Sequence, residues 1–274
     1  MESGKSYMEL MKKRKSVRTF DGRPLTAEDR EKLAAAIAGI GNPFGIPVEF
    51  RILDAAEYGL TSPVIVGAHA YLAAKAKRQP DFELACGYAF ERACLEALAL
   101  GIGTVMLAAS LNRPAFERAL EVGGDEVMPV ASPIGYPAEK RSVRETLMRK
   151  GIRADTRLPF GEIFFDGSFG KPLDQEKAGA LAPVLDCVRW SPSAANRQPC
   201  RAVIDGDRVH FYEAKSMKDS PLGDIQRFDC GIAMAHFELA SMEQGRTGSF
   251  VRADPGIPLP EGVLYAASWQ PGNA

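Results

Sequence analysis

The feature that most constrains this chain is an internal repeat whose two copies lie about 145 positions apart. The segment Asp229–Ala233 resembles Ala85–Ala89, and Phe169–Leu173 resembles Phe20–Leu25. The matching pairs are Pro24 with Pro172 at an offset of 148, and Gly87 with Gly231 and Gly101 with Gly245, both at 144. Two helix starts and one helix end kept in register indicate a duplicated unit. We therefore predict two intertwined halves, residues 1–160 and 161–274, joined across residues 149–167.

The composition is that of a folded protein with balanced charge. The 274 residues are 46% hydrophobic and 25% charged, which is enough to form a core, and the net charge is -1. Such a chain has no overall attraction for nucleic acid or an anionic membrane, and we expect neither as a partner. A nucleic-acid module built on the basic run Lys12–Arg18 is an alternative, but balanced charge and the lack of an aromatic stripe argue against it.

Targeting signals and metal motifs are also missing from the sequence. No apolar run follows Met1, and no stretch approaches the roughly 18 to 20 apolar residues that span a bilayer. The five cysteines are odd in number and lack CxxC spacing, and the three histidines form no HExxH motif. We therefore expect reduced, buried thiols, no metal site and a cytoplasmic protein.

The hydrophobic pattern predicts an α+β protein. Thr26 is an expected N-cap, and Gly101 an expected helix C-cap. Helices are predicted over residues 6–18, 26–38, 82–100, 112–121 and 175–189. Strands are predicted over residues 48–53, 64–66, 70–72, 104–108, 127–134 and 202–204, with 104–108 central.

A basic segment near the N-terminus is the first candidate site. Arg14, Ser16 and Arg18 offer two guanidinium forks and a hydroxyl, which suit a tetrahedral dianion. At a frayed helix end these three groups can converge. The alternative is a solvated basic helix face, which is how we interpret Lys12 and Lys13.

Two further segments carry polar groups beside rigid turns. Arg189–Pro199 is a Ser-Pro-Ser-Ala-Ala-Asn loop whose backbone and amide groups can bind a polar heteroaromatic edge, or else it is an ordinary surface turn. The turn Gly135–Pro137 is followed by Lys140, Arg141 and Arg144, and by itself it indicates little.

Together these motifs resemble the FMN-dependent nitroreductase family, and the resemblance covers nearly the whole chain. In an ordinary member one subunit of about 200 residues carries every motif, and a homodimer forms two flavin sites. Here the first half has Gly41–Gly45 in place of the Ser-Pro-Ser loop, and the second half has Gly167–Gly170 in place of the arginine motif. The chain therefore resembles the fused branch, in which one polypeptide mimics the dimer.

The resemblance implies a nitroreductase-like α/β sandwich with mostly antiparallel sheets, and one FMN per chain. The second pseudo-symmetric site is expected to be empty. The implied phosphate ligands are Arg14, Lys15, Ser16 and Arg18, with Arg141 or Arg144 helping. The implied contacts of the ribityl chain and ring are Pro192, Ser193 and Asn196, with Ala108, Ala109 and Ser110 near flavin N5.

The implied reaction passes hydride from NADH or NADPH through flavin to a small electrophile such as a nitroaromatic, a quinone or an enone. No catalytic side chain is predicted, and the lack of a GxGxxG motif argues against a separate dinucleotide fold. The alternative is a flavin-binding carrier or redox sensor without turnover. Cys200 is interpreted as a buried small residue, with a redox thiol as the alternative. A monomer or a weak homodimer is expected.

Overall fold

The structure is a computed structural model that describes residues 5–140 and 142–272. Its contacts divide the chain into two compact units. Unit 1 contains Met1–Lys12, Glu83–Tyr88 and Asp155–Ala274, and unit 2 contains Lys13–Phe82 and Ala89–Ala154. The predicted halves, 1–160 and 161–274, stay a prediction, because these units are defined by contacts and not by the repeat.

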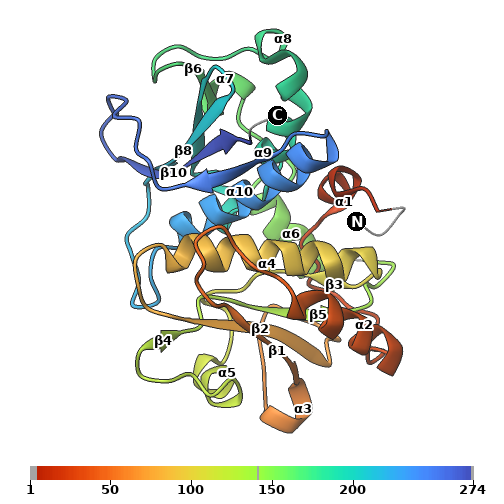
Figure 1. The fold of residues 1–274 in the computed structure, drawn as a ribbon. Coiled ribbons are helices and arrows are strands. Elements are labelled where there is room, and N and C mark those ends of the chain that lie inside the picture. Colours follow the sequence, from red (N-terminus) through yellow and green to blue (C-terminus); the bar gives the residue numbers. More distant parts are fainter. Residues whose placement is uncertain (1–4, 141, 273–274) are drawn as a thin grey trace. The chain divides into compact units, whose positions relative to one another are not determined.

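Unit 2 is built on an antiparallel sheet with helices beside it (Figure 1). The strand order is β1-β2-β5-β3, and β4 pairs with the end of β2. The strands are β1 (Glu49–Asp54), β2 (Ala70–Lys77), β3 (Gly103–Thr104), β4 (Glu126–Val127) and β5 (Ala131–Gly135). The helices are α2 (Ala27–Ala38), α3 (Ala55–Tyr58), α5 (Arg113–Ala119), α6 (Val143–Gly151) and most of α4 (Phe82–Ala99). A core cluster joins β1, β2 and α5, where the rings of Tyr71 and Phe116 meet edge to face at 4.9 Å.

Unit 1 has a second sheet, with strand order β6-β7-β8-β10-β9. Only the β6–β7 pair is parallel among these strands. The strands are β6 (Phe164–Asp166), β7 (Cys200–Asp205), β8 (Arg208–Ala214), β9 (Gly248–Val251) and β10 (Val263–Pro271). The helices are α1 (Tyr7–Lys13), α7 (Phe160–Ile163), α8 (Gln175–Ala178), α9 (Ala182–Arg189) and α10 (Ile225–Glu243), with 3₁₀ turns η1 (Gly179–Leu181) and η2 (Ala194–Asn196). Helix α10 packs against α9 and against strands β7 and β8 (Figure 1).

Within unit 1 the start of α4 crosses α10 at two glycines. A Cβ atom added to Gly87 would overlap the carbonyl oxygen of Phe228, and one added to Gly231 would overlap that of Leu84. The contact is reciprocal, since Phe228 lies 144 positions after Leu84, the offset that also separates the two glycines. Self-complementary contacts of this kind are what a two-fold pair of equal helices makes. The pairing therefore gives a structural reason for the two repeated glycines.

Several predicted elements are confirmed, and their local causes are visible. Helix α2 begins after Thr26, whose hydroxyl oxygen accepts the Asp29 N–H at 3.1 Å. Helix α4 ends before Gly101, which has φ of 75°. In the joining segment Ile163 and Phe164 are buried and Phe165 is half-buried.

Other predicted boundaries are wrong. The strand predicted over 104–108 is the two-residue β3, which lies at the end of the strand order and not in the centre. The strand predicted over 127–134 is divided into β4 and β5 around Pro129, which cannot donate to a ladder. The helix predicted over 175–189 is broken at Gly179, where φ is 53°. Residues 64–66 form one bridge, Thr19 to Val66, and no strand.

The fold class is confirmed as α+β with mostly antiparallel sheets flanked by helices. None of the helices in residues 5–140 and 142–272 combines the length and the apolar character needed to cross a membrane.

Candidate functional site

We had predicted a helix over residues 6–18 with the basic segment at its end, and this prediction is wrong. Helix α1 stops at Lys13, and the following residues are extended. Ser16 forms a parallel bridge with Thr104, and Val17 N–H donates to the Thr104 carbonyl oxygen at 2.9 Å. The main chain is held by these distant partners and cannot continue the helix. Alternate residues of an extended chain share a side, so Ser16 and Arg18 are expected to face one way.

Arg14 is committed to an internal ion pair in unit 2. Its Nε lies 3.3 Å from Oε1 of Glu91 on α4, and the two side chains are 8% and 0% exposed. A buried carboxylate needs such a partner because its desolvation is costly. Arg14 therefore has a structural role, whether or not its remaining N–H groups also bind an anion.

Arg18 is the better placed cation for an external anion. Its Nε is buried and has no hydrogen-bond partner among the residues that the structure describes. Burial lowers the pKa of Arg18; the negative charge of Glu145 opposes this, and the positive charge of Arg149 adds to it. Arginine stays protonated under such shifts, so a charged donor is held ready beside the half-buried Ser16 and the exposed Lys15.

Helix α6 supplies an internal anion to the same segment. Oε2 of the buried Glu145 accepts the Arg18 N–H at 3.3 Å and the Thr19 hydroxyl at 2.9 Å. A cavity of about 470 Å³ opens between this helix, the segment 17–19 and the turn after Gly135. Its lining comprises Val17, Thr19, Pro137, Ala138, Glu139, Lys140, Glu145 and Thr146.

Arg144 and Arg141 are the two arginines that were predicted to assist in binding the phosphate. Arg144 is exposed, and its Nη1 donates to the Pro63 carbonyl oxygen at 2.5 Å. Arg141 lies outside the described residues. Arg18 and Arg144 both contact the segment 63–66 of unit 2. Arg144 donates to Pro63 O, and Val66 N–H donates to the Arg18 carbonyl oxygen at 2.9 Å.

The loop after β3 is fixed by an arginine that the sequence reasoning missed. Arg113 donates from Nη1 to Met128 O and from Nη2 to Ala108 O, both at 2.6 Å. The Ser62 hydroxyl donates to Ser110 O at 2.5 Å. These bonds leave Ala109 exposed on a fixed loop. The only signal in the sequence for the role of Arg113 is that this cation lies close to the loop along the chain.

The Ser-Pro-Ser loop belongs to unit 1 and has an unusual backbone. Ala195, Asn196 and Gln198 have φ of 49°, 54° and 51°, a region that side-chain-bearing residues rarely adopt. Ser193 Oγ accepts the Gln198 N–H at 2.8 Å, which closes the loop on itself. Pro192 and Ser193 are half-buried beside it. Strain of this type is retained where the surroundings over-determine the backbone, which is common at functional sites.

Asn196 makes contacts that the sequence reasoning did not predict. Its Nδ2 donates to Thr156 O at 3.2 Å, and its Oδ1 accepts from Arg157 Nη1 at 3.3 Å. The Arg157 guanidinium also lies 4.8 Å from the centroid of the Trp190 ring. The segment joining the halves therefore braces the loop. No motif marks Thr156 or Arg157, so this brace could not be found from the sequence.

The predicted site residues thus lie in two sets. Arg14, Lys15, Ser16, Arg18, Ala108, Ala109, Ser110 and Arg144 are in unit 2, and Pro192, Ser193 and Asn196 are in unit 1. The first set contains cationic donors that suit an anion, whereas the Ser193 hydroxyl and the Asn196 amide of the second set already make hydrogen bonds within unit 1. Across residues 5–140 and 142–272 no cluster of three or more His, Cys, Asp or Glu side chains suits a metal ion.

A protein family described as "Putative TM nitroreductase" matches residues 6–241. The structure of a "putative nitroreductase" from Thermotoga maritima MSB8 is 18% identical with a TM-score of 0.66, over 98% of this chain and 95% of that chain.

Two more solved structures match about half of this chain. An FMN-dependent nitroreductase from Clostridium difficile R20291 is 18% identical over 48% of this chain and 88% of its own, with a TM-score of 0.42. An iodotyrosine deiodinase bound to FMN and 3-iodo-L-tyrosine is 17% identical over 50% of this chain and 92% of its own, with a TM-score of 0.40. No curated protein matches the sequence.

Proposed function

The chain belongs to the nitroreductase family, and from that premise we propose that it is an FMN-dependent oxidoreductase. We propose that NADH or NADPH donates hydride and that a small electrophile such as a nitroaromatic, a quinone or an enone accepts it. The observation that carries the proposal is the buried Arg18 Nε, which has no hydrogen-bond partner among the described residues and adjoins Ser16 and Lys15. A buried guanidinium donor is costly unless an anion completes it.

The donor set of unit 2 fits a flavin phosphate. A phosphate dianion accepts hydrogen bonds at three oxygens, and guanidinium, hydroxyl and ammonium groups are its usual partners. Arg18, Ser16 and Lys15 supply one of each within a few residues. We propose that these three hold the phosphate, and that Arg144 and Arg141 assist. We assign Arg14 a smaller part, since it is paired with Glu91.

The other predicted contacts are proposed on the same basis. FMN, when bound, supplies the hydride-accepting and hydride-donating centre of the reaction. Ser193, Pro192 and Asn196 are proposed to bind and orient the ribityl chain and ring edge. Ala108, Ala109 and Ser110 are proposed to form a fixed loop near the reacting edge, which Arg113 holds in place. No side chain of this set is assigned a proton-transfer step.

We propose a single flavin for each chain. In the second half the segment that replaces the arginine motif packs against aromatic rings. The ring centroid of Phe169 lies 5.1 Å from that of Phe165 and 5.0 Å from that of Tyr212. In the first half Asn42 closes its own turn, because its Nδ2 donates to Ile46 O at 2.6 Å and its Oδ1 accepts the Phe44 N–H at 3.1 Å. Neither segment keeps the donors of its counterpart.

Purified protein tests the cofactor directly. We expect a yellow preparation that releases about one FMN per chain on denaturation. Two FMN per chain would overturn the single-site proposal. A colourless protein that takes up no added FMN would overturn the flavin proposal itself.

Arg18→Ala tests the phosphate ligands. Loss of a charged hydrogen bond should weaken FMN binding by about 1.5 to 3 kcal/mol, measured by fluorescence titration. Lys13→Ala is the matched control, because it removes an exposed positive charge next to the segment and should change the affinity little. Equal affinities for both variants would show that Arg18 has been misassigned.

Turnover separates an enzyme from a flavin carrier or sensor. Steady-state oxidation of NADH or NADPH with a quinone acceptor, by a ping-pong rate law, is the expected result. Tight flavin binding without any such turnover would favour the carrier.

A further inference from the structure

The strained loop rests on one buried carboxyl group of α10. Asp229 is 4% exposed, and its Oδ2 accepts the Ala194 N–H at 2.9 Å, across 35 positions of sequence. A small cavity of about 10 Å³, at the lower limit for holding a single water molecule, lies beside this contact between the loop and the helix. Its polar lining includes Arg189, Ser191, Ser193, Gln198 and Asp229.

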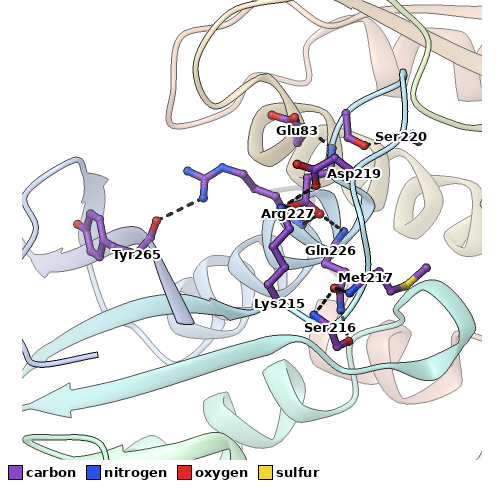
Figure 2. Close-up of polar contacts among 11 residues, drawn as sticks. Glu83, Lys215, Ser216, Met217, Asp219, Ser220, Gln226, Arg227 and Tyr265 are labelled. Atoms are coloured by element: carbon purple, nitrogen blue, oxygen red, sulfur yellow. Dashed lines mark hydrogen bonds and ion pairs between the residues drawn. The ribbon is translucent and has the colours of Figure 1, made fainter. Parts of the chain in front are cut away.

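The helix that carries Asp229 is firmly anchored at its start. Asp224 caps α10 by accepting the N–H groups of Gln226 and Arg227 at 2.8 and 3.2 Å. Figure 2 shows Gln226 meeting Ser216 and Met217, whose N–H groups donate to its Oε1 at 2.7 and 2.6 Å. Asp229 therefore projects from a fixed position about one turn further along.

The side chains of Asn196 and Gln198 tie the loop to residues 156–158, whereas Asp229 ties its backbone to α10. Ala195, Asn196 and Gln198 all have positive φ, and only Asn among these types tolerates that region well. The bonds inside the loop run from Asn196 N–H to Ser193 O and from Gln198 N–H to Ser193 Oγ. Ala194 N–H is the donor that ties this closed unit to the helix.

We propose that Asp229 is the positioning residue of Ser193–Gln198, and that its side chain acts as a hydrogen-bond acceptor for the backbone of this loop. Its carbonyl oxygen takes the Ala194 N–H and fixes the backbone that presents Ser193 and Asn196. That these two side chains meet a flavin rests on the proposed function; that Asp229 fixes the loop does not.

The surroundings favour the neutral form of Asp229. Two charged groups act on the Asp229 side chain: Asp224, at the start of its own helix, and Glu213, from β8. Both are acidic. Arg189 of α9 lines the same small cavity but pairs with Asp186 at 2.9 Å. Burial raises the pKa of Asp229 well above its ordinary value, and the two carboxylates add to this, although the Ala194 N–H acts in the opposite direction. A neutral carboxyl group still accepts one N–H bond.

Hydrogen exchange on the protein without added FMN tests this role. The reporter is the peptide that covers residues 191–200, whose hydrogen-bonded backbone N–H groups include those of Ser191, Ala194, Asn196, Arg197 and Gln198. Asp229→Ala should speed its exchange at least about tenfold, the factor expected for loss of one buried hydrogen bond. Asp229→Asn keeps a neutral carbonyl acceptor of equal size, and exchange should stay within about threefold of wild type.

Two controls make every outcome decisive. A peptide from β8 reports on the unit as a whole and should not change in Asp229→Ala. Ser241→Ala removes another fully buried polar group from α10, far along the helix from the loop, and should leave residues 191–200 unchanged. The proposal is overturned if Asp229→Ala leaves the exchange rate of residues 191–200 unchanged, or if it raises the exchange rates of this peptide and the β8 peptide equally. Fast exchange in Asp229→Asn would overturn the neutral acceptor.

A flavin titration of the same variants keeps the two proposals apart. If the chain binds FMN, its dissociation constant should rise in Asp229→Ala by at least about tenfold and be restored in Asp229→Asn. If wild type binds no FMN, the proposed function fails while the exchange result still decides the role of Asp229.

Discussion

The crossing of α4 and α10 at two glycines predicts a large loss of stability from one methyl group. A Cβ added to Gly87 would lie 2.8 Å from the carbonyl carbon of Phe228, and one added to Gly231 would lie 2.9 Å from that of Leu84. Carbon atoms in contact prefer about 3.5 to 4.0 Å, and the two carbonyl oxygens lie nearer still, so the helices must separate by about 1 Å or more. Neither obstacle is a side chain that can rotate away. The strain therefore passes to the packing of both helices.

The magnitude follows from two opposing terms. Overpacking of a rigid site costs about 3 kcal/mol, at the upper end of the usual range. Alanine in place of glycine in a helix interior returns about 1 kcal/mol. Gly87→Ala should therefore lower the free energy of unfolding by about 2 kcal/mol. For a chain of this size that corresponds to a melting temperature roughly 4 to 8 °C lower.

Thermal and denaturant unfolding followed by circular dichroism measure this loss. Gly151→Ala is the matched control, because Gly151 ends α6 with a negative φ and open space around its Cβ position. It should be neutral or stabilise the chain by up to about 1 kcal/mol. A Gly87→Ala variant within about 0.5 kcal/mol of wild type would refute the reasoning.

The reciprocity of the contact gives a second, sharper criterion. Once Gly87→Ala has separated the helices, Gly231→Ala finds part of its space already open. The double variant should thus lose less than the sum of the single losses, by at least about 0.5 kcal/mol. Strict additivity would mean that the two glycines do not share one crossing.

Three more expectations concern buried charge and capping. Burial, followed by the negative charge of Asp224, raises the pKa of Glu213 to about 7. The neutral form of Glu213 therefore stabilises the folded chain. This contribution is complete below about pH 4.5 and is lost as the pH rises through 7. Glu213→Gln should therefore gain stability relative to wild type between pH 5 and pH 8, by up to about 3 kcal/mol, and parallel denaturation curves across that range would contradict this. Arg14→Ala should destabilise the chain by about 3 kcal/mol because it leaves the fully buried Glu91 without its arginine, and Arg14→Met with Glu91→Leu should recover much of the loss in equilibrium unfolding. Thr26→Ala should cost about 1 kcal/mol and Thr26→Ser almost nothing, since only the cap oxygen of α2 matters; equal losses would refute the cap.

Local signals in the sequence were reliable where the cause was local. The cap of α2 at Thr26 and the end of α4 at Gly101 depend on a few neighbouring residues, and both were predicted. The overlong first helix shows the opposite case. Its pattern continued to Arg18, but the chain leaves the helix at Lys13 to pair with Thr104, nearly 90 positions away. No propensity of the segment itself contains that partner.

The candidate site was predictable in its cations but not in its anions. Arg14 and Arg18 were identified as donors, yet nothing in the sequence selects Glu91 and Glu145 as the carboxylates that meet them. An acid in a helix is usually a solvated residue, and its burial is decided by tertiary packing. The same holds for Thr156, which takes the amide of Asn196. Which donors remain for a ligand can be judged only once these internal partners are known.

The repeat offset also explains why a second phosphate site is not expected. At the Pro24–Pro172 offset of 148, Arg14, Ser16 and Arg18 correspond to Glu162, Phe164 and Asp166, which directly precede the Gly167–Gly170 segment that replaces the motif. Two carboxylates would repel a phosphate dianion, and Phe164 is fully buried in β6, where it packs 4.6 Å from Phe160. At this offset the second copy would carry two carboxylates in place of the two arginines, and its central position, Phe164, belongs to the core. Restoring a donor at Phe164 would remove a core side chain, so we expect the packing that stabilises β6 to oppose a second phosphate site there.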